Sequence, residues 1–121
     1  NGRERFRNYY EEAKNNILAQ ANDLKGISFY ECDYTYWNSI KDCLIYCDPP
    51  YQGTKQYANA TQFDYEKFWQ WCRDMSKNNI VIISEQNAPD DFTCIWQQEV
   101  SRSIKATDKS KSVEKLFIYN I

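Results

Sequence analysis

A short apolar run that stops at two consecutive prolines is the feature that most constrains the fold of this chain. Residues 44–51 read LIYCDPPY. An apolar run of this length, bounded by turn residues, predicts a buried strand of a parallel sheet. Because proline has no N–H to donate, Pro49 and Pro50 cannot continue a hydrogen-bond ladder. Asp48 is therefore predicted at the carboxyl end of the strand, the edge at which open α/β sheets bind ligands.

The residues that follow this strand have the chemistry to hold a planar ring that bears an amine. Asp48 supplies a carboxylate, the two prolines supply carbonyls, and Tyr51 supplies an aromatic face. A charged acceptor makes the stronger hydrogen bond to an amine, and nucleic-acid bases stack on aromatic side chains. The same residues also suit a turn that merely ends a strand, so the elements around them must support the functional interpretation.

The first third of the chain predicts a helix and then a strand. Apolar residues at spacings of three and four predict a helix within residues 3–24 that has one apolar face. Lys25 and Gly26 form a typical helix end. Loose alternation of apolar and polar residues predicts a strand over residues 27–32. Asp33 then follows this strand as Asp48 follows the next one.

The rest of the chain predicts a strand–helix–strand unit and a closing hairpin. Asp64 is a candidate N-cap for a helix over residues 65–77. The apolar run at 80–84 predicts a second buried strand. Residues 93–100 and 113–120 predict an antiparallel pair of strands. Helices that alternate with strands indicate an α/β fold, here with a mixed sheet.

Three stretches resemble the amino-methyltransferases that use S-adenosylmethionine (SAM). The segment DPPY after an apolar strand resembles their catalytic motif, and its Asp form is typical of Dam-like, D12-class DNA adenine N6-methyltransferases. Residues 27–34 (ISFYECDY) resemble the strand whose terminal acidic residue meets the adenine of SAM. Residues 112–121 (SVEKLFIYNI) resemble the last strand of that fold. The resemblance covers residues 27–121 and implies part of the Rossmann-like methyltransferase fold, with a C-terminal antiparallel strand pair.

The glycine-rich SAM loop of that family has no counterpart here, because the three glycines of the chain lie far apart. We therefore expect the fold to lack the N-terminal glycine-loop strands. Residues 1–121 are then a single catalytic segment of a larger methyltransferase. Within it, residues 1–26 would be a helix at the trailing edge of the target-recognition region, and residues 27–121 the core portion. The missing N-terminal half of the enzyme, or a second chain, is the expected partner, and the segment is not expected to be active alone.

The resemblance also implies roles for the four residues of DPPY. Asp48 and the carbonyl of Pro49 would accept the two N–H bonds of the exocyclic N6 amine of a flipped adenine. Pro50 would stiffen the turn, and Tyr51 would stack on the base. The cofactor implied is SAM, which donates the methyl group.

Cofactor and DNA contacts follow from the same resemblance. Asp33 would accept a hydrogen bond from the adenine of SAM, and the backbone N–H of Tyr34 would serve its ring nitrogen. From the residues alone, a turn that ends a strand is as good an interpretation of Asp33. DNA contacts are expected from Lys55, Tyr57, Lys109 and Lys111.

Other conspicuous side chains have structural interpretations. Glu85, directly after the second buried strand, could line the site but is expected to face solvent. The four tryptophans are expected in the core or at an interface: Trp37, Trp69, Trp71 and Trp96.

The amino-acid composition limits which partners, metal sites and cellular environments the chain suits. The net charge of −2 gives no overall attraction to nucleic acid, so DNA contact must depend on local clusters. The five cysteines are an odd number without a C-x-x-C pair, and the chain has no histidine, which argues against a zinc site. Free, buried thiols in a reducing cytoplasm are the simplest interpretation. The sequence has no apolar run long enough for a membrane span.

Two alternatives to adenine methylation remain open at this stage. The same acceptor geometry would serve another planar amine, such as N4 of cytosine or N2 of guanine in RNA. The chain could also be non-catalytic, as a truncated remnant or an interaction domain that keeps the loop without binding SAM.

Overall fold

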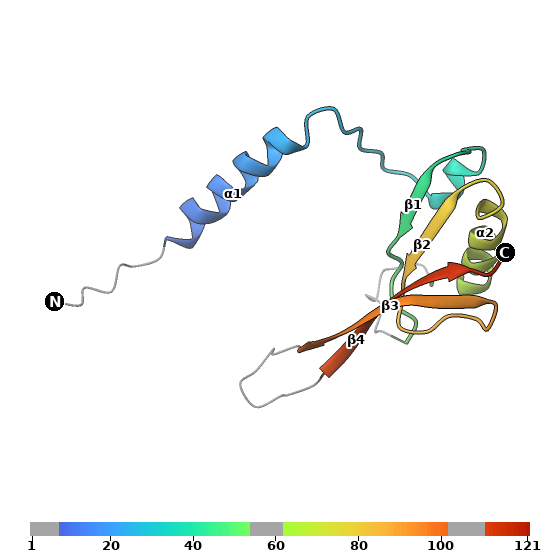
Figure 1. Cartoon of the computed structure of the whole chain (residues 1–121). Helices are drawn as coiled ribbons and strands as arrows, with labels where there is room; N and C mark the ends of the chain where they lie inside the picture. The colour runs from blue at the N-terminus through green and yellow to red at the C-terminus, as the bar shows by residue number, and fades with distance from the viewer. Residues whose placement is uncertain (1–7, 54–61, 102–110) are drawn as a thin grey trace. The chain divides into compact units, whose positions relative to one another are not determined.

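The computed structural model describes residues 8–53, 62–101 and 111–121. The chain divides into two compact units, Asn1–Asp33 and Tyr34–Ile121. In chain order the elements are α1 (Tyr9–Asp23), the 3-10 helix η1 (Tyr34–Trp37), β1 (Leu44–Cys47), α2 (Tyr65–Met75), β2 (Ile80–Ser84), β3 (Phe92–Ser101) and β4 (Lys111–Tyr119) (Figure 1).

The first unit is built around α1, the predicted N-terminal helix. The side chain of Asn8 caps it by accepting a hydrogen bond from the backbone N–H of Glu11, at 3.2 Å. Shortly after the helix, Gly26 adopts a φ of +88°, a conformation that glycine reaches without a steric penalty. None of the residues of α1 is buried, so the predicted apolar face is present but exposed.

The predicted strand over residues 27–32 is wrong, because this segment has no regular secondary structure. Its large apolar side chains, Ile27, Phe29 and Tyr30, are all exposed. A strand needs a partner to satisfy its backbone N–H and C=O groups. No strand pairs with this segment among the residues that the structure describes. The alternation of its side chains alone therefore does not hold it in a sheet.

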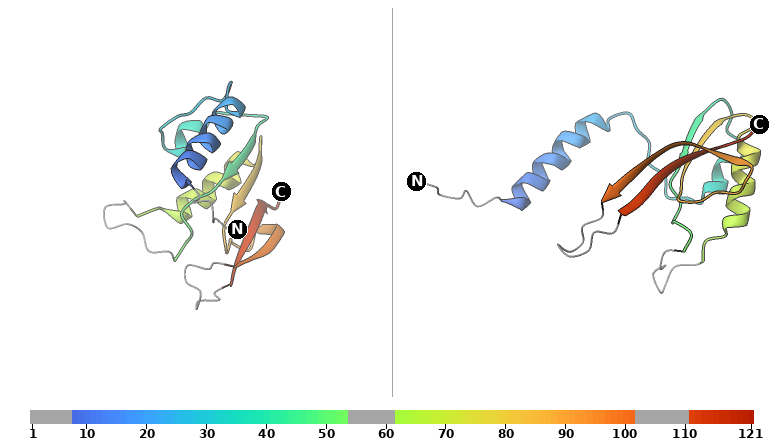
Figure 2. Two further views of the ribbon diagram at one scale, coloured as in Figure 1. Left: turned by 90° about the vertical axis from the view of Figure 1, so that its left-hand side faces the viewer. Right: turned by 60° about the horizontal axis from the view of Figure 1, so that its bottom comes forward.

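The second unit contains a four-stranded mixed sheet with the order β1-β2-β4-β3. β1 and β2 are parallel, while β4 lies antiparallel to both of its neighbours, β2 and β3. The predicted parallel strands and the predicted antiparallel pair are thus confirmed. β3 and β4 run side by side as a long ribbon in both views of Figure 2.

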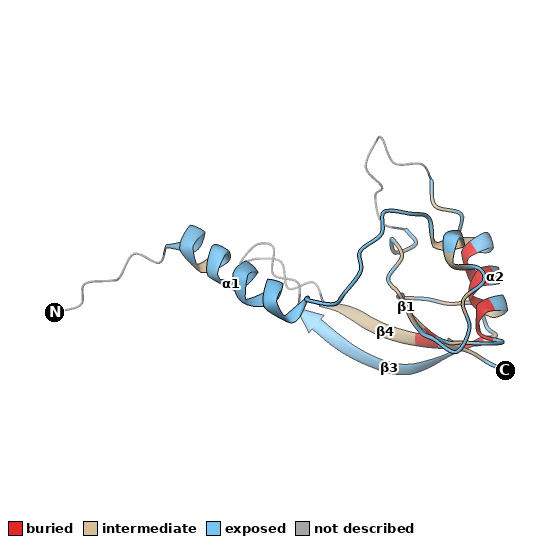
Figure 3. Cartoon of the chain, turned by 90° about the horizontal axis from the view of Figure 1, so that it is seen from above, coloured by how far each residue is buried: buried red, intermediate tan, exposed pale blue. Residues whose placement is uncertain are grey.

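The core lies between α2 and one face of the sheet. The cap predicted at Asp64 is confirmed, since its side chain accepts a hydrogen bond from the N–H of Lys67 at 3.1 Å. The buried residues of α2 and of the sheet form one cluster: Phe68, Trp69, Trp71, Cys72, Met75, Val81, Ile83, Phe92 and Phe117. Figure 3 shows this burial concentrated on α2.

The opposite face of β1 is open. The sequence predicts burial on both faces of this strand, but Leu44 is 68% exposed and Tyr46 is 60% exposed. Only the side chains that alternate with them, Ile45 and Cys47, pack against the core. The expectation of full burial was wrong because α2 covers one face only.

All five cysteines carry free thiols, as predicted. Their predicted burial holds for Cys72 and in part for Cys47, but Cys32, Cys43 and Cys94 are exposed. Cys32 lies in the segment without regular structure, and Cys43 precedes β1. In the described ranges, no helix combines the length and apolar character needed to cross a bilayer. The same ranges contain no cluster of three or more side chains suited to binding a metal ion.

Candidate active site

The DPPY segment lies at the carboxyl edge of the two parallel strands. The register pairs Cys47, the last residue of β1, with Ile83 of β2. Asp48 and Ser84 therefore come next at the same level of the sheet. As predicted, β1 ends where the prolines begin, and Asp48 is exposed at that edge.

The two proline carbonyls differ in their surroundings. The hydroxyl of Tyr65, the first residue of α2, donates a hydrogen bond to the carbonyl of Pro50 at 2.8 Å. This bond ties the loop to the helix. Within the described ranges, no hydrogen bond reaches the carbonyl of Pro49 or the carboxylate of Asp48. These two acceptors are the ones that the resemblance assigns to the target amine.

Tyr51 is held by its hydroxyl group between two other strands. The hydroxyl donates a hydrogen bond to Oε2 of Glu114 on β4. It also lies 2.9 Å from Oγ of Ser84, the last residue of β2. Because a phenol has one proton and a carboxylate only accepts, the Ser84 hydroxyl is the donor in the second bond. Burial and then the hydrogen bond to Glu114 raise the pKa of Tyr51 above its ordinary value, so the phenol stays protonated and able to donate.

Glu85 is a buried carboxylate beneath the loop, and the expectation that it faces solvent is wrong. Its side chain is within the interior, with the residue only 2% exposed. One carboxylate oxygen accepts the N–H of Gln86 at 2.8 Å and the other that of Gln52 at 3.4 Å. The backbone N–H of Glu85 also donates a hydrogen bond to the carbonyl of Lys115, at 3.2 Å. Burial raises the pKa of Glu85, and the charge of Asp48 adds to this.

The raised pKa of Glu85 predicts a loss of stability as pH rises. At pH values between about 4.5, the ordinary pKa of the side chain, and the raised pKa, the folded protein still holds a proton that the unfolded chain has released. The free energy of unfolding therefore falls as the pH rises through this range. Glu85→Gln should remove this part of the pH dependence. Urea unfolding at a series of pH values measures it, and a wild-type slope that persists unchanged in the variant would show that another group is responsible.

The predicted cofactor residues lie on either side of the boundary between the units. Asp33 is exposed at the end of the first unit. The ring of Tyr34 packs against the core, with ring centroids 5.6 Å from Phe68 and 5.2 Å from Trp71. Their assignment to SAM stays a prediction.

Of the predicted DNA-contacting residues, Lys111 alone is described. It begins β4 and forms an ion pair with Glu99 of β3 at 3.8 Å. Lys55, Tyr57 and Lys109 lie outside the described residues.

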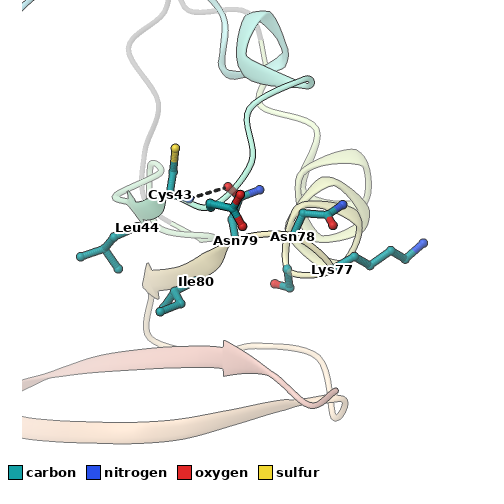
Figure 4. Close-up of a pocket in the computed structure, with 8 residues that line it drawn as sticks. Cys43, Leu44, Lys77, Asn78, Asn79 and Ile80 are labelled. Atoms are coloured by element: carbon teal, nitrogen blue, oxygen red, sulfur yellow. Dashed lines mark hydrogen bonds between the residues drawn. The ribbon is translucent and has the colours of Figure 1, made fainter.

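Among the residues that the structure describes, hollows lie at both ends of the parallel strands. One of about 380 Å³ adjoins the DPPY loop and is lined by Gln52, Gln62, Phe63, Asp64, Tyr65 and Glu66. The other, of about 570 Å³, lies where β1 and β2 begin (Figure 4). There the Asn79 side chain accepts the N–H of Cys43 at 3.1 Å and donates to the carbonyls of Ile40 and Met75. Asn79 thus ties the end of α2 to the start of β1, which is a structural role.

Sequence reasoning missed three residues that hold the loop. Ser84, Glu114 and Tyr65 lie on three elements that are separated in the chain. Their convergence depends on β4 lying beside β2, which periodicity does not predict. A usable signal was the position of Ser84 at the end of a strand parallel to β1 and of Glu85 directly after it, because such strands end at the same edge.

Comparison with known families gives a match over the first part of the chain. The sequence model of the D12 class N6 adenine-specific DNA methyltransferases matches residues 2–72, which is more than half of the chain and includes the DPPY segment. No curated protein and no solved structure gives a match. The chain belongs to the D12 class of N6 adenine-specific DNA methyltransferases.

Proposed function

We propose that this chain carries the amine-binding part of an enzyme that transfers a methyl group from SAM to N6 of adenine in DNA. The observation that carries the proposal is the DPPY loop at the carboxyl edge of the parallel strands. Asp48 is exposed there, the Pro50 carbonyl is taken by Tyr65, and the Tyr51 hydroxyl is anchored on β2 and β4.

Asp48 and Pro49 prepare the amine for attack. The lone pair of an adenine amine is delocalised into the ring, so the nitrogen is a poor nucleophile. Accepting one N–H bond on the Asp48 carboxylate and the other on the Pro49 carbonyl draws the nitrogen toward tetrahedral geometry and frees its lone pair. Because both acceptors are already in place, little reorganisation is needed. After transfer, the proton of the resulting ammonium passes to Asp48 or to water.

Tyr51 offers its ring to the flipped base. Removing a base from the duplex costs a few kcal/mol, and stacking on an aromatic ring returns about 1–3 kcal/mol. The Tyr51 hydroxyl is engaged at the far end of the ring, and we assign the flipped base to a face of that ring.

SAM supplies the activated methyl group when bound, and the residues present fit part of its site. An exposed carboxylate on Asp33 and the N–H of Tyr34 suit the edge of an adenine ring. We propose that a glycine-rich segment, in the same or a second polypeptide, completes the site. The sheet as described ends at β1, which leaves that edge open for further strands. In this view the Rossmann-like sheet is completed beyond β1.

We also place the enzyme in the cytoplasm. Its five cysteines are free thiols, three of them exposed. Exposed thiols stay reduced in the cytoplasm.

Tyr51→Ala is expected to weaken binding of a flipped adenine by about 1–3 kcal/mol, because the stacking surface is lost. The measurement is a fluorescence titration with DNA that carries 2-aminopurine at the target position. Trp96→Ala, which removes an aromatic residue that is not part of the loop, is the matched control. An unchanged affinity in Tyr51→Ala would argue against stacking.

The proposed function is tested by transfer of labelled methyl groups from SAM to three substrates. The first is DNA in which one strand carries exocyclic amines on adenine only. The second is DNA in which one strand carries them on cytosine only, and the third is an RNA that contains guanine. We expect label in the adenine substrate. Label in cytosine DNA or guanine RNA instead would identify a different amino-methyltransferase, and binding without transfer to any substrate would favour a non-catalytic domain.

A further inference from the structure

The hydroxyl of Tyr51 joins three elements that are distant in the sequence. Tyr51 lies in the loop after β1, Ser84 ends β2, and Glu114 lies on β4. Ser84 and Glu114 are brought together by the pairing of β2 with β4, in which Ser84 lies opposite Leu116. The hydroxyl uses its proton toward Glu114 and its oxygen toward Ser84, so each partner has a distinct role.

Hydrogen bonds to the Tyr51 hydroxyl restrict the position of the ring more than a contact with another part of the side chain would. The backbone holds one end of the side chain, and the hydrogen bonds of the hydroxyl hold the other end. The long axis of the ring is then set, and only rotation about that axis remains. A ring held in this way keeps its position at the sheet edge whether or not a base is present.

We propose that Glu114 and Ser84 are positioning residues, which hold the Tyr51 ring where a flipped adenine stacks on it. This inference rests on the proposed function. Neither residue touches the base. They act through Tyr51, and they remove the need to order the ring when the base arrives.

The test compares Tyr51→Phe, Glu114→Ala and the double variant in the intact protein that carries this segment. Each single variant is expected to weaken 2-aminopurine DNA binding. Glu114→Ala should lower kcat/KM about tenfold, the scale of one lost hydrogen bond, and Tyr51→Phe, which loses both bonds, should lower it by at least as much. The double variant should be no worse than Tyr51→Phe, because that variant already removes the bond to Glu114 together with the bond from Ser84. Glu114→Gln keeps an acceptor oxygen and should recover most of the loss.

A second readout separates positioning from a general effect on the fold. The titration of Tyr51, followed by NMR of its ring carbon and assigned with Tyr51→Phe, should shift to lower pH in Glu114→Ala, since Glu114 contributes to the raised pKa of that phenol. SAM affinity and the unfolding midpoint should stay near wild type. Asp74→Ala, which removes an exposed acid on α2, is the control for loss of a negative charge.

The outcomes distinguish this inference from the function on which it rests. The positioning role alone would be overturned if the wild type were active and the Glu114→Ala and Tyr51→Phe variants bound 2-aminopurine DNA normally. Losses of binding that add up in the double variant would overturn it as well. A wild type that binds SAM and DNA but methylates no adenine would overturn the proposed function, and the positioning role with it.

Discussion

Replacing Asp48 with alanine is expected to abolish methyl transfer while leaving SAM affinity unchanged. The carboxylate is the charged acceptor for the target amine, and it lies on the DPPY loop rather than among the predicted cofactor residues. Loss of a preorganised group that stabilises the developing charge costs about 100-fold to 1,000-fold in kcat. The comparison requires single-turnover transfer rates and a calorimetric titration of SAM for wild type and variant.

Asp48→Asn serves as the matched variant for this prediction. The amide keeps one acceptor oxygen and the shape of the side chain but loses the charge, so transfer should be slow yet measurable. If Asp48→Ala lost SAM binding and methyl transfer to the same extent, Asp48 would belong to the cofactor site and the assignment to the amine would fail.

The largest expected effect on stability comes from Trp69. This side chain is 5% exposed, and its ring centroid lies 4.8 Å from that of Phe92 on β3. Truncation of a buried aromatic residue to alanine costs about 3–5 kcal/mol, through lost transfer energy and the cavity that remains. Trp69→Ala should therefore lower the free energy of unfolding by that amount in a urea titration.

Trp96 provides the matched comparison, because it is the same residue type on β3 but is 46% exposed. Trp96→Ala should cost clearly less than Trp69→Ala. Equal losses at the two positions would mean that the packing of α2 on the sheet does not dominate the stability of this unit.

The elements that the sequence predicts well are those whose causes are local. The prolines end β1 because they lack N–H groups, and Asp64 begins α2 because its carboxylate caps the helix. The stripe of Phe68, Trp71 and Cys72 is buried because helical spacing puts these residues on one face. The placement of DPPY at the carboxyl edge follows from the same local rules.

The features that escaped prediction depend on partners elsewhere in the chain. Residues 27–32 alternate like a strand but have no strand beside them in the described ranges. Glu85 carries a charge that favours solvent, yet it is buried, and its carboxylate accepts hydrogen bonds from the backbone N–H groups of Gln52 and Gln86. Glu114 joins the loop only because β4 lies between β2 and β3.

The most direct test of the account is the position of the transferred methyl group. The protein, together with the glycine-rich segment proposed to complete its SAM site, is incubated with DNA and with SAM whose methyl group is deuterated, and the DNA is then hydrolysed to nucleosides for mass spectrometry. We expect N6-methyl-2′-deoxyadenosine that carries the deuterated methyl group to form with wild type and to be lost with Asp48→Ala. Label on another base, or an unchanged yield in Asp48→Ala, would contradict it.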